Sequence, residues 1–215
     1  MRIVRLPGVF KPRSDTWLLA AHMRRLPQAG GAVVDVCTGS GAIAITAARA
    51  SAISVTAVDV SRRALATTRI NARLNGVRVR TRRGRLLAAV PGEAFDLIVS
   101  NPPYLPSEEE EIPTRGTARH TEAGPDGRVL LDQLIAQAPA HLRAGGVLLV
   151  THSSINGEEE SLERMRDAGL EPSVLERRRG PLGPLLAARR GHLEASGLLE
   201  PGAAEEDLLI LAGAA

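Results

Sequence analysis

The chain has 215 residues, 44% of them hydrophobic and 24% charged, with a formal net charge of +3. This composition excludes a disordered chain and favours one globular domain over residues 1–215, and the single cysteine, Cys37, excludes an intramolecular disulfide and a multi-cysteine zinc site. No apolar run reaches the roughly 18 residues of a membrane-spanning helix, and the N-terminus lacks the apolar core of a secretion signal, so we predict a cytoplasmic protein without a membrane segment.

Short β-branched runs alternate with longer helical stretches, which predicts a doubly wound α/β domain with a mostly parallel sheet. The first helix is expected from Ser14 to Leu26, with Ser14 or Asp15 as its N-terminal cap. The strands expected next are Ala32–Cys37, Ser54–Asp59, Val77–Thr81 and Phe95–Ser100. The helices expected between them are Gly41–Ala50 and Ser61–Leu74.

The second half of the chain begins with an irregular polar segment, Pro102–Pro125. Helices are then expected at Gly127–Leu142 and Gly157–Ala168, and strands at Gly146–Val150, Glu171–Arg177 and Asp207–Leu211. Residues Gly180–Ala204 form an insertion between the last two strands that is longer than a hairpin loop, and its middle, Pro184–Ser196, reads as a helix. We favour an extra packed helix there over a lid or a partner surface.

A glycine loop, Thr38-Gly39-Ser40-Gly41, lies where the first strand becomes a helix. Gly39 and Gly41 permit backbone conformations that a Cβ would block, so a ligand can approach the main chain closely. Asp59 ends the next strand, and parallel strands place their carboxyl ends at the one sheet edge where ligands bind. An acid there can accept both hydroxyls of a ribose, which predicts an adenosine-containing ligand.

The same loop leaves a second interpretation open, because Gly39–Ala44 also matches the G-x-G-x-x-A dinucleotide pattern of nicotinamide-dependent oxidoreductases. Asp35, directly before the loop, argues against a dinucleotide, since a carboxylate repels a pyrophosphate and attracts a cationic, amine-bearing ligand. A sulfonium cofactor with an α-amino group fits better. The structural alternative for Asp35 is a strand-end or helix-capping carboxylate.

Asn101-Pro102-Pro103-Tyr104 follows the apolar strand Phe95–Ser100. The two prolines fix φ and withhold both N–H groups, which leaves the neighbouring carbonyls rigid and available. The Asn101 side-chain oxygen and the Pro102 carbonyl can then accept hydrogen bonds from one planar NH₂ group, while Tyr104 stacks on the plane that carries it. Beside a glycine loop and a ribose acid, this motif indicates a clamp for an amide or an exocyclic amine rather than a simple turn.

Three ordered segments, DVCTGSGAIAI, AVDVS and FDLIVSNPPYLP, together resemble the HemK-type (PrmC) family of S-adenosylmethionine-dependent methyltransferases, which modify the glutamine of peptide-release factors. The resemblance extends over most of the chain from Val9 to Val150, and GVFKPRSDTWLLA resembles the start of the short branch that lacks an N-terminal helical domain. It implies a seven-stranded sheet with one antiparallel strand. AGPDGR, at Ala123–Arg128, resembles the glycine-rich segment that follows the catalytic motif.

The resemblance also implies the residues of the site. Those that would bind the cofactor are Asp15, Thr16, Asp35, Thr38, Gly39, Gly41, Asp59 and Asn101. Asn101, Pro102, Pro103 and Tyr104 would hold the substrate nitrogen, with Asn101, Pro102 and Tyr104 catalytic and no metal. One departure is Gly84-Arg85-Leu86, where the family usually has an acid near the adenine amine; an arginine cannot accept a hydrogen bond, so the adenine pocket must differ or affinity falls.

We therefore predict an S-adenosylmethionine-dependent N-methyltransferase acting on a protein glutamine such as that of a release factor. The main alternative is an adenine-N6 methyltransferase acting on RNA or DNA, because an exocyclic adenine amine suits the same clamp. Arg78, Arg80 and Arg82 would supply a basic surface, but charges on an edge strand also prevent strand-to-strand association, and an aromatic content of 2% leaves few stacking platforms. A non-catalytic cofactor-binding module is the remaining alternative. The sequence does not identify an obligate protein partner.

Overall fold

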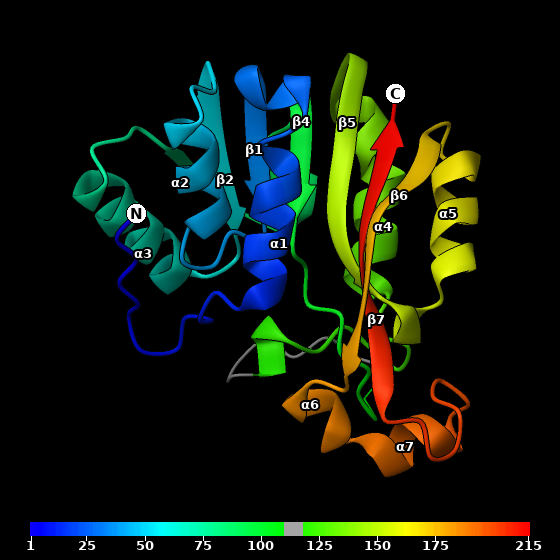
Figure 1. The fold of residues 1–215 in the computed structure, drawn as a ribbon. Helices are drawn as coiled ribbons and strands as arrows, with labels where there is room; N and C mark the ends of the chain where they lie inside the picture. The colour runs from blue at the N-terminus through cyan, green and yellow to red at the C-terminus, as the bar shows by residue number, and fades with distance from the viewer. Residues whose placement is uncertain (110–117) are drawn as a thin grey trace.

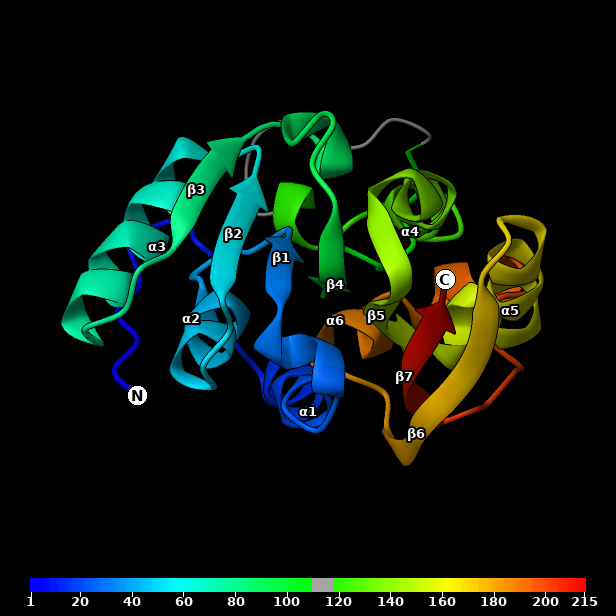
Figure 2. The same ribbon diagram turned by 90° about the horizontal axis from the view of Figure 1, so that it is seen from above.

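The computed structural model describes residues 1–109 and 118–215. Its centre is a seven-stranded sheet in the order β3-β2-β1-β4-β5-β7-β6 (Figures 1 and 2). The strands are β1 Ala32–Val36, β2 Ser54–Asp59, β3 Arg80–Arg83, β4 Phe95–Ser100, β5 Leu142–Ser153, β6 Glu171–Pro181 and β7 Glu205–Ala214. The helices are α1 Ser14–Met23, α2 Ala42–Arg49, α3 Arg62–Leu74, α4 Val129–Gln137, α5 Glu158–Asp167, α6 Pro184–Ala187 and α7 Arg190–Ala195.

Among the strands that the structure describes, only β7 runs against its neighbours. The pairs from β3 through β5 are parallel, whereas β7 pairs antiparallel with both β5 and β6. This confirms the predicted doubly wound α/β sheet with one antiparallel strand.

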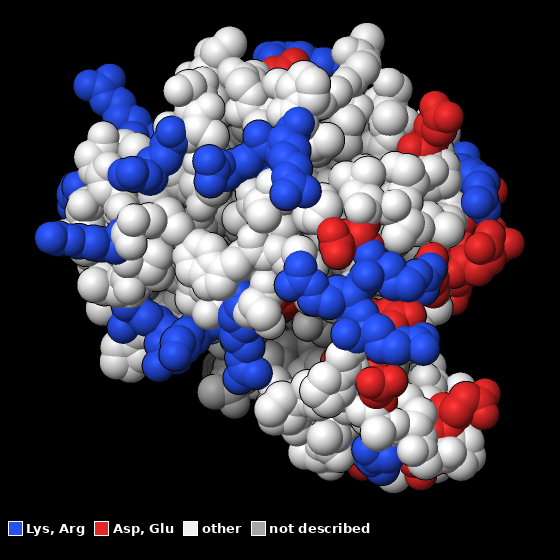
Figure 3. Space-filling model, in the orientation of Figure 1, with Lys and Arg blue, Asp and Glu red and all other residues white. Residues whose placement is uncertain are grey.

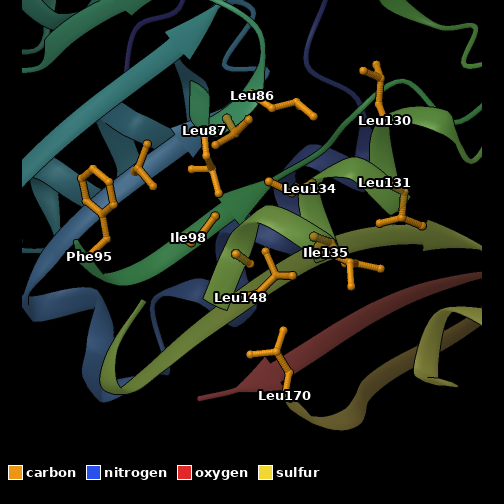
Figure 4. Packing of buried hydrophobic residues seen from close by; sticks show 14 of the residues in the cluster. Leu86, Leu87, Phe95, Ile98, Leu130, Leu131, Leu134, Ile135, Leu148 and Leu170 are labelled. Carbon is orange, nitrogen blue, oxygen red and sulfur yellow. The ribbon is translucent and has the colours of Figure 1, made fainter. Parts of the chain in front are cut away.

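Helices cover both faces of the sheet. Successive residues of β1 point to opposite faces, and both faces are apolar: Val33 belongs to the core cluster under α1 and α2, whereas Val34 belongs to the cluster under α4 and α5. Figure 2 shows α1 and α2 on one side of the sheet and α4 on the other. In Figure 4, Leu134 of α4 lies against Ile98 of β4 and Leu148 of β5, and all three are fully buried.

The order of the strands determines where a ligand can bind. From β1 the chain moves outward through β2 to β3, then returns to the other side of β1 for β4 and β5. In a doubly wound sheet the loops diverge at this reversal, and ligands bind outside the carboxyl ends of the strands there. The glycine loop after β1 and the Asn101 segment after β4 are the two loops at this position.

The insertion between β6 and β7 lies at the same edge. Because β7 alone is antiparallel, β6 has the direction of the other strands and ends at their carboxyl edge, below the sheet in Figure 1. The helices α6 and α7 form a small lobe there. Its buried leucines, Leu182, Leu186, Leu193 and Leu199, pack with Leu105 and Ile155 in a separate apolar cluster.

The first predicted helix is wrong at its end. It was expected to reach Leu26, but α1 ends at Met23. Leu26 is extended, with ψ 133°, because the Pro27 ring that follows disfavours a helical conformation in the preceding residue.

The third strand begins later than predicted. Val77 was expected to start it, but the Val77 N–H donates to the Ala72 carbonyl at 3.0 Å and so still closes the end of α3. Pairing with β2 starts only at Arg80, opposite Thr56. Val77, which was expected to begin the strand, therefore belongs to the cap at the end of α3.

Other boundaries also moved. The helix expected to reach Leu142 ends at Gln137, where a 3-10 turn containing Pro139 follows, and the last three strands are longer than expected. The single helix expected over Pro184–Ser196 is divided into α6 and α7. The predicted irregular segment Pro102–Pro125 includes residues 110–117, which lie outside the described residues.

Within the described part of the chain, no helix is both long and apolar enough to cross a lipid bilayer.

Leu134→Ala tests the α4 core. Because Leu134 is fully buried in the sheet-facing cluster, we expect a loss of about 3 kcal/mol or more in the free energy of unfolding, from lost burial and a residual cavity. Denaturant unfolding measures it. Leu74→Ala, at a leucine that is 48% exposed at the end of α3, is the matched control and should cost less than about 1 kcal/mol. Equal losses in the two variants would contradict the assignment of the core.

Candidate active site

The glycine loop turns sharply between β1 and α2. Gly39 and Gly41 have φ values of 54° and 80°, in the left-handed region that favours glycine. At Gly41 a Cβ would also come within 2.7 Å of the Thr68 side chain, so α3 approaches the loop too closely for any larger residue. Both glycines are therefore required for the conformation of this loop, whose residues Thr38, Gly39 and Ser40 line a pocket.

Asp35 supports this loop from beneath. It is completely buried, and its Oδ2 accepts hydrogen bonds from the Thr38 hydroxyl at 2.5 Å and the Ala44 N–H at 3.0 Å. Asp35 is not among the residues that line the pocket, and in the structure its carboxylate fixes the loop and the start of α2. Its expected contact with a cofactor stays a prediction.

Burial raises the pKa of Asp35 to about 7. Removal from water is the main cause, the hydrogen bonds from Thr38 and Ala44 oppose it, and the negative charge of Asp59 adds to it. Its Oδ1 has no hydrogen-bond partner among the described residues. Asp35 therefore changes charge within the neutral range.

Asp59 lies at the carboxyl end of β2 and lines the pocket. Its Oδ2 accepts the Gly39 N–H at 3.0 Å, and its Oδ1 accepts the Ser61 N–H at 2.8 Å. These bonds fix the carboxylate beside the glycine loop. An ionised carboxylate offers about four acceptor positions, so this arrangement is compatible with further hydrogen bonds to a ligand.

The Asn101 side chain is held by two residues of the N-terminal helix α1. Its Nδ2 donates to Asp15 Oδ2 at 3.0 Å and to Thr16 Oγ1 at 3.3 Å, both in the first turn of α1. Its Oδ1 is buried and has no hydrogen-bond partner in the described structure. A buried acceptor without a partner costs about 1–3 kcal/mol unless a ligand supplies a donor.

Tyr104 is oriented at both ends. Its hydroxyl donates to Asp15 Oδ2 at 3.4 Å, and its carbonyl accepts the Asn156 Nδ2–H at 2.8 Å. Asn156 also donates to the Asp126 carbonyl at 2.8 Å, and a Cβ on Gly127 would lie 2.2 Å from the Tyr104 carbonyl oxygen. The AGPDGR segment thus packs directly against the motif that precedes it.

The pKa of Tyr104 is raised, first by burial and then by the negative charges of Asp15 and Glu206. Burial likewise raises the pKa of the Cys37 thiol, with further contributions from Asp59 and Asp35. Both groups therefore stay protonated near neutral pH. Tyr104 acts here as a hydrogen-bond donor, and Cys37 as a small neutral side chain rather than a nucleophile.

These elements enclose one cavity of about 410 Å³. Most residues predicted for the site line it: Asp15, Thr16, Thr38, Gly39, Asp59, Asn101, Pro102, Pro103 and Tyr104. Gly41 and Asp35 are not among them; Gly41 is the last residue of the loop, and Asp35 is buried directly before it. Arg85 lines the cavity, and its Nε donates to Gln133 Oε1 at 3.0 Å.

Part of the cavity wall was not predicted. Gly183, Pro184, Leu185 and Leu186 of the insertion line it, as does Glu206 at the start of β7. Glu206 accepts hydrogen bonds from the Ser153 hydroxyl at 2.6 Å and the Gly183 N–H at 3.0 Å. The direction of β6 could have indicated this part of the wall, because β6 ends at the ligand-binding edge and the insertion begins there.

The basic residues do not form one continuous basic surface on the face shown in Figure 3. Over β6 and β7 they are interspersed with acidic residues. Arg177 pairs with Glu158 and Asp207, and Arg179 with Asp207. On the edge strand β3, Arg80 pairs with Glu93. The edge-strand arginine Arg80 thus has a local carboxylate partner.

Comparisons with known proteins point to methyltransferases. The family model described as "Methyltransferase small domain" matches residues 1–116. The chain is 31% identical to a provisionally named protein N5-glutamine methyltransferase of Methanocaldococcus jannaschii, over 84% of this chain and 90% of that protein. It is 40% identical to the release factor glutamine methyltransferase of Streptomyces coelicolor over 70% of this chain, but spans only 57% of that protein.

Among solved structures, the fold resembles the E. cuniculi Mtq2–Trm112 complex, described as responsible for methylation of the eRF1 translation termination factor. The TM-score is 0.66 at 22% identity, covering 96% of this chain and 98% of that one. At this identity the likeness concerns the fold alone.

The raised pKa of Asp35 predicts a pH-dependent stability. Between its ordinary value of 3.8 and about 7, the native state keeps a proton that the unfolded chain loses, so the free energy of unfolding should fall as pH rises through this range. At about 1.4 kcal/mol per pKa unit, the fall amounts to a few kcal/mol. Asp35→Asn keeps an acceptor for Thr38 and Ala44 and should remove this fall in denaturant unfolding between pH 4.5 and 7.5. Asp96→Asn is the control; the same pH slope in Asp35→Asn and wild type would show that Asp35 does not titrate there.

Proposed function

Because the chain belongs to the HemK-type family of methyltransferases, we propose that it transfers a methyl group from S-adenosylmethionine to the side-chain nitrogen of a glutamine in a protein. The name of the Streptomyces relative points to a release factor as the substrate. The observation that carries the proposal is Asn101, a residue of the cavity wall whose buried Oδ1 has no hydrogen-bond partner in the described structure. A primary amide is a donor that fits it.

The residues present fit S-adenosylmethionine. A Cβ on Gly39 would meet no protein atom nearer than 4.0 Å, so the space beside this residue is open to a ligand. Asp59 would accept the ribose hydroxyls, and Thr38, Gly39 and the N-terminal residues Phe10 and Thr16 also line the cavity. The cavity volume lies in the range of small-molecule sites. When bound, the sulfonium supplies an electrophilic methyl group.

The protein's own task is to make an amide nitrogen reactive and to position it. An amide NH₂ that donates to Asn101 Oδ1 and to the Pro102 carbonyl keeps both protons on one side, which leaves the nitrogen lone pair directed at the methyl group. The pyrrolidine rings of Pro102 and Pro103 fix the backbone that carries these acceptors. Orientation of two reactants can supply about 7–11 kcal/mol of the barrier reduction.

The alternatives have less support. An adenine amine would satisfy the same acceptors, but the relatives are named for protein glutamine, and Arg80 on the edge strand has a carboxylate partner. Membership of a methyltransferase family removes the support for a nicotinamide-dependent oxidoreductase. The intact Asn101 and Tyr104 argue against a binding module without chemistry.

Asn101→Ala tests the clamp. We expect kcat to fall by about 100-fold or more, because the variant loses an acceptor that orients the nucleophile, while the Kd for S-adenosylhomocysteine stays within about threefold of wild type. Methyl transfer from labelled donor to a glutamine-bearing release factor measures turnover, and calorimetry measures the Kd. Asn75→Ala, at the end of α3, is the control. Near-normal turnover in Asn101→Ala would refute this mechanism.

Asp59→Asn tests the ribose contact. The variant keeps one acceptor oxygen and loses the negative charge, so we expect the Kd for S-adenosylhomocysteine to rise about 10-fold or more, as for the loss of a hydrogen bond to a charged group. Calorimetry measures it, with Asp96→Asn as the control. An unchanged Kd would exclude Asp59 from the cofactor site.

A further inference from the structure

Asp15 accepts hydrogen bonds from its own helix, α1, and from the Asn101 segment. It is the second residue of α1 and is 7% exposed. Its Oδ1 accepts the Thr16 N–H at 2.6 Å and the Thr16 hydroxyl at 3.3 Å. Its Oδ2 accepts the Asn101 amide at 3.0 Å and the Tyr104 hydroxyl at 3.4 Å. Both oxygens are therefore used on the protein itself, and Oδ2 is used on the two polar side chains of the acceptor clamp.

This contact determines how the Asn101 side chain is oriented. An amide has one end that donates and one that accepts, whereas an ionised carboxylate only accepts. The donating end of Asn101 must therefore face Asp15, and Thr16 Oγ1 takes its second hydrogen at 3.3 Å. The accepting end is then directed away from Asp15 and Thr16, and it is buried with no partner among the described residues.

We infer that Asp15 is a positioning residue, which holds the Asn101 amide so that its oxygen, and not its NH₂ group, faces the acceptor nitrogen. The inference rests on the proposed function, which supplies the amide nitrogen that Asn101 would bind. It gives Asp15 a role in the acceptor clamp, in place of the direct cofactor contact implied by the family resemblance. With the amide reversed, two NH₂ groups would face each other, and the acceptor would lose a hydrogen bond and its orientation.

The short Thr16 N–H bond indicates what an asparagine at position 15 would do. Its single oxygen would take the Oδ1 position, since the Thr16 N–H at 2.6 Å needs an acceptor. Its NH₂ group would then face Asn101 and favour the reversed amide. Asp15→Asn should therefore reverse Asn101 while leaving the size and packing of position 15 unchanged.

The test exchanges the two side chains. Asp15→Asn alone should lower kcat by about 10- to 100-fold, the cost expected when a reacting group is misplaced. Asn101→Asp alone places two carboxylates against each other and should also be impaired. In the double variant the asparagine NH₂ donates to the new carboxylate, whose other oxygen faces the cavity, so we expect turnover at least about 10-fold above that of both single variants.

The readouts separate positioning from other roles. The Kd for S-adenosylhomocysteine should stay within about threefold in every variant, and Asp96→Asn, at the opposite end of β4, should leave kcat unchanged. Turnover of Asp15→Asn within about threefold of wild type, or a folded double variant no better than the single ones, would overturn the inference. A rise in Kd that matches the loss of turnover would make Asp15 a cofactor ligand instead.

A spectroscopic measurement distinguishes failure of this inference from failure of the proposed function. In the wild type, the Asn101 side-chain NH₂ protons should show nuclear Overhauser contacts to the Thr16 side chain, and in Asp15→Asn these contacts should be lost. Contacts that persist in Asp15→Asn would refute the positioning role. Absence of methyl transfer to any glutamine-bearing protein by the wild type would refute the proposed function and leave this measurement unaffected.

Discussion

The reversal of strand order beside β1 is the constraint on which the site depends. Because β2 and β4 flank β1 and all three are parallel, their carboxyl ends and the loops that follow are at one edge. Residues distant in sequence, such as Gly39, Asp59 and Asn101, line one cavity there without any long excursion of the chain. The polar groups can be fixed by short local bonds because the sheet has already brought them together.

Three carboxylates near this edge have different environments and therefore different roles. Asp35 is fully buried under the glycine loop, and burial raises its pKa. Asp59 lies on the cavity wall and is held by two backbone N–H groups. Asp15 is buried among N–H and O–H donors from α1 and from the Asn101 segment. The three roles follow from the surroundings of each carboxylate, because the residue type is the same.

The sequence predicts those parts of the fold whose signals are local. The bounds of β2 and β4 agree with prediction because apolar runs end at polar residues there. The helix α3 ends at Leu74, as expected, and the Ser61 side chain caps its start. The motif residues Asn101 and Tyr104 line the cavity because their place after a strand determines it.

What the sequence did not predict depends on packing between distant segments. Asp35 looked like a ligand-binding acid, but only the position of Thr38 and Ala44 above it shows that it is enclosed. The start of β3 depends on the cap of α3. Glu206 gave no local signal, because its place in the cavity depends on the pairing of β6 with β7.

That pairing has an evolutionary consequence. Pro181 and Glu205 are paired neighbours in the sheet, so the stretch between them leaves and returns at almost one point. Its leucines form their own cluster with Leu105, and Leu186 of that cluster also lines the cavity. A shorter, longer or unrelated stretch could be grafted between these two residues while the glycine loop and Asp59 keep their geometry. Such an exchange would change the part of the cavity wall that Gly183 and Leu186 form, and leave the loops after β1 and β2 as they are.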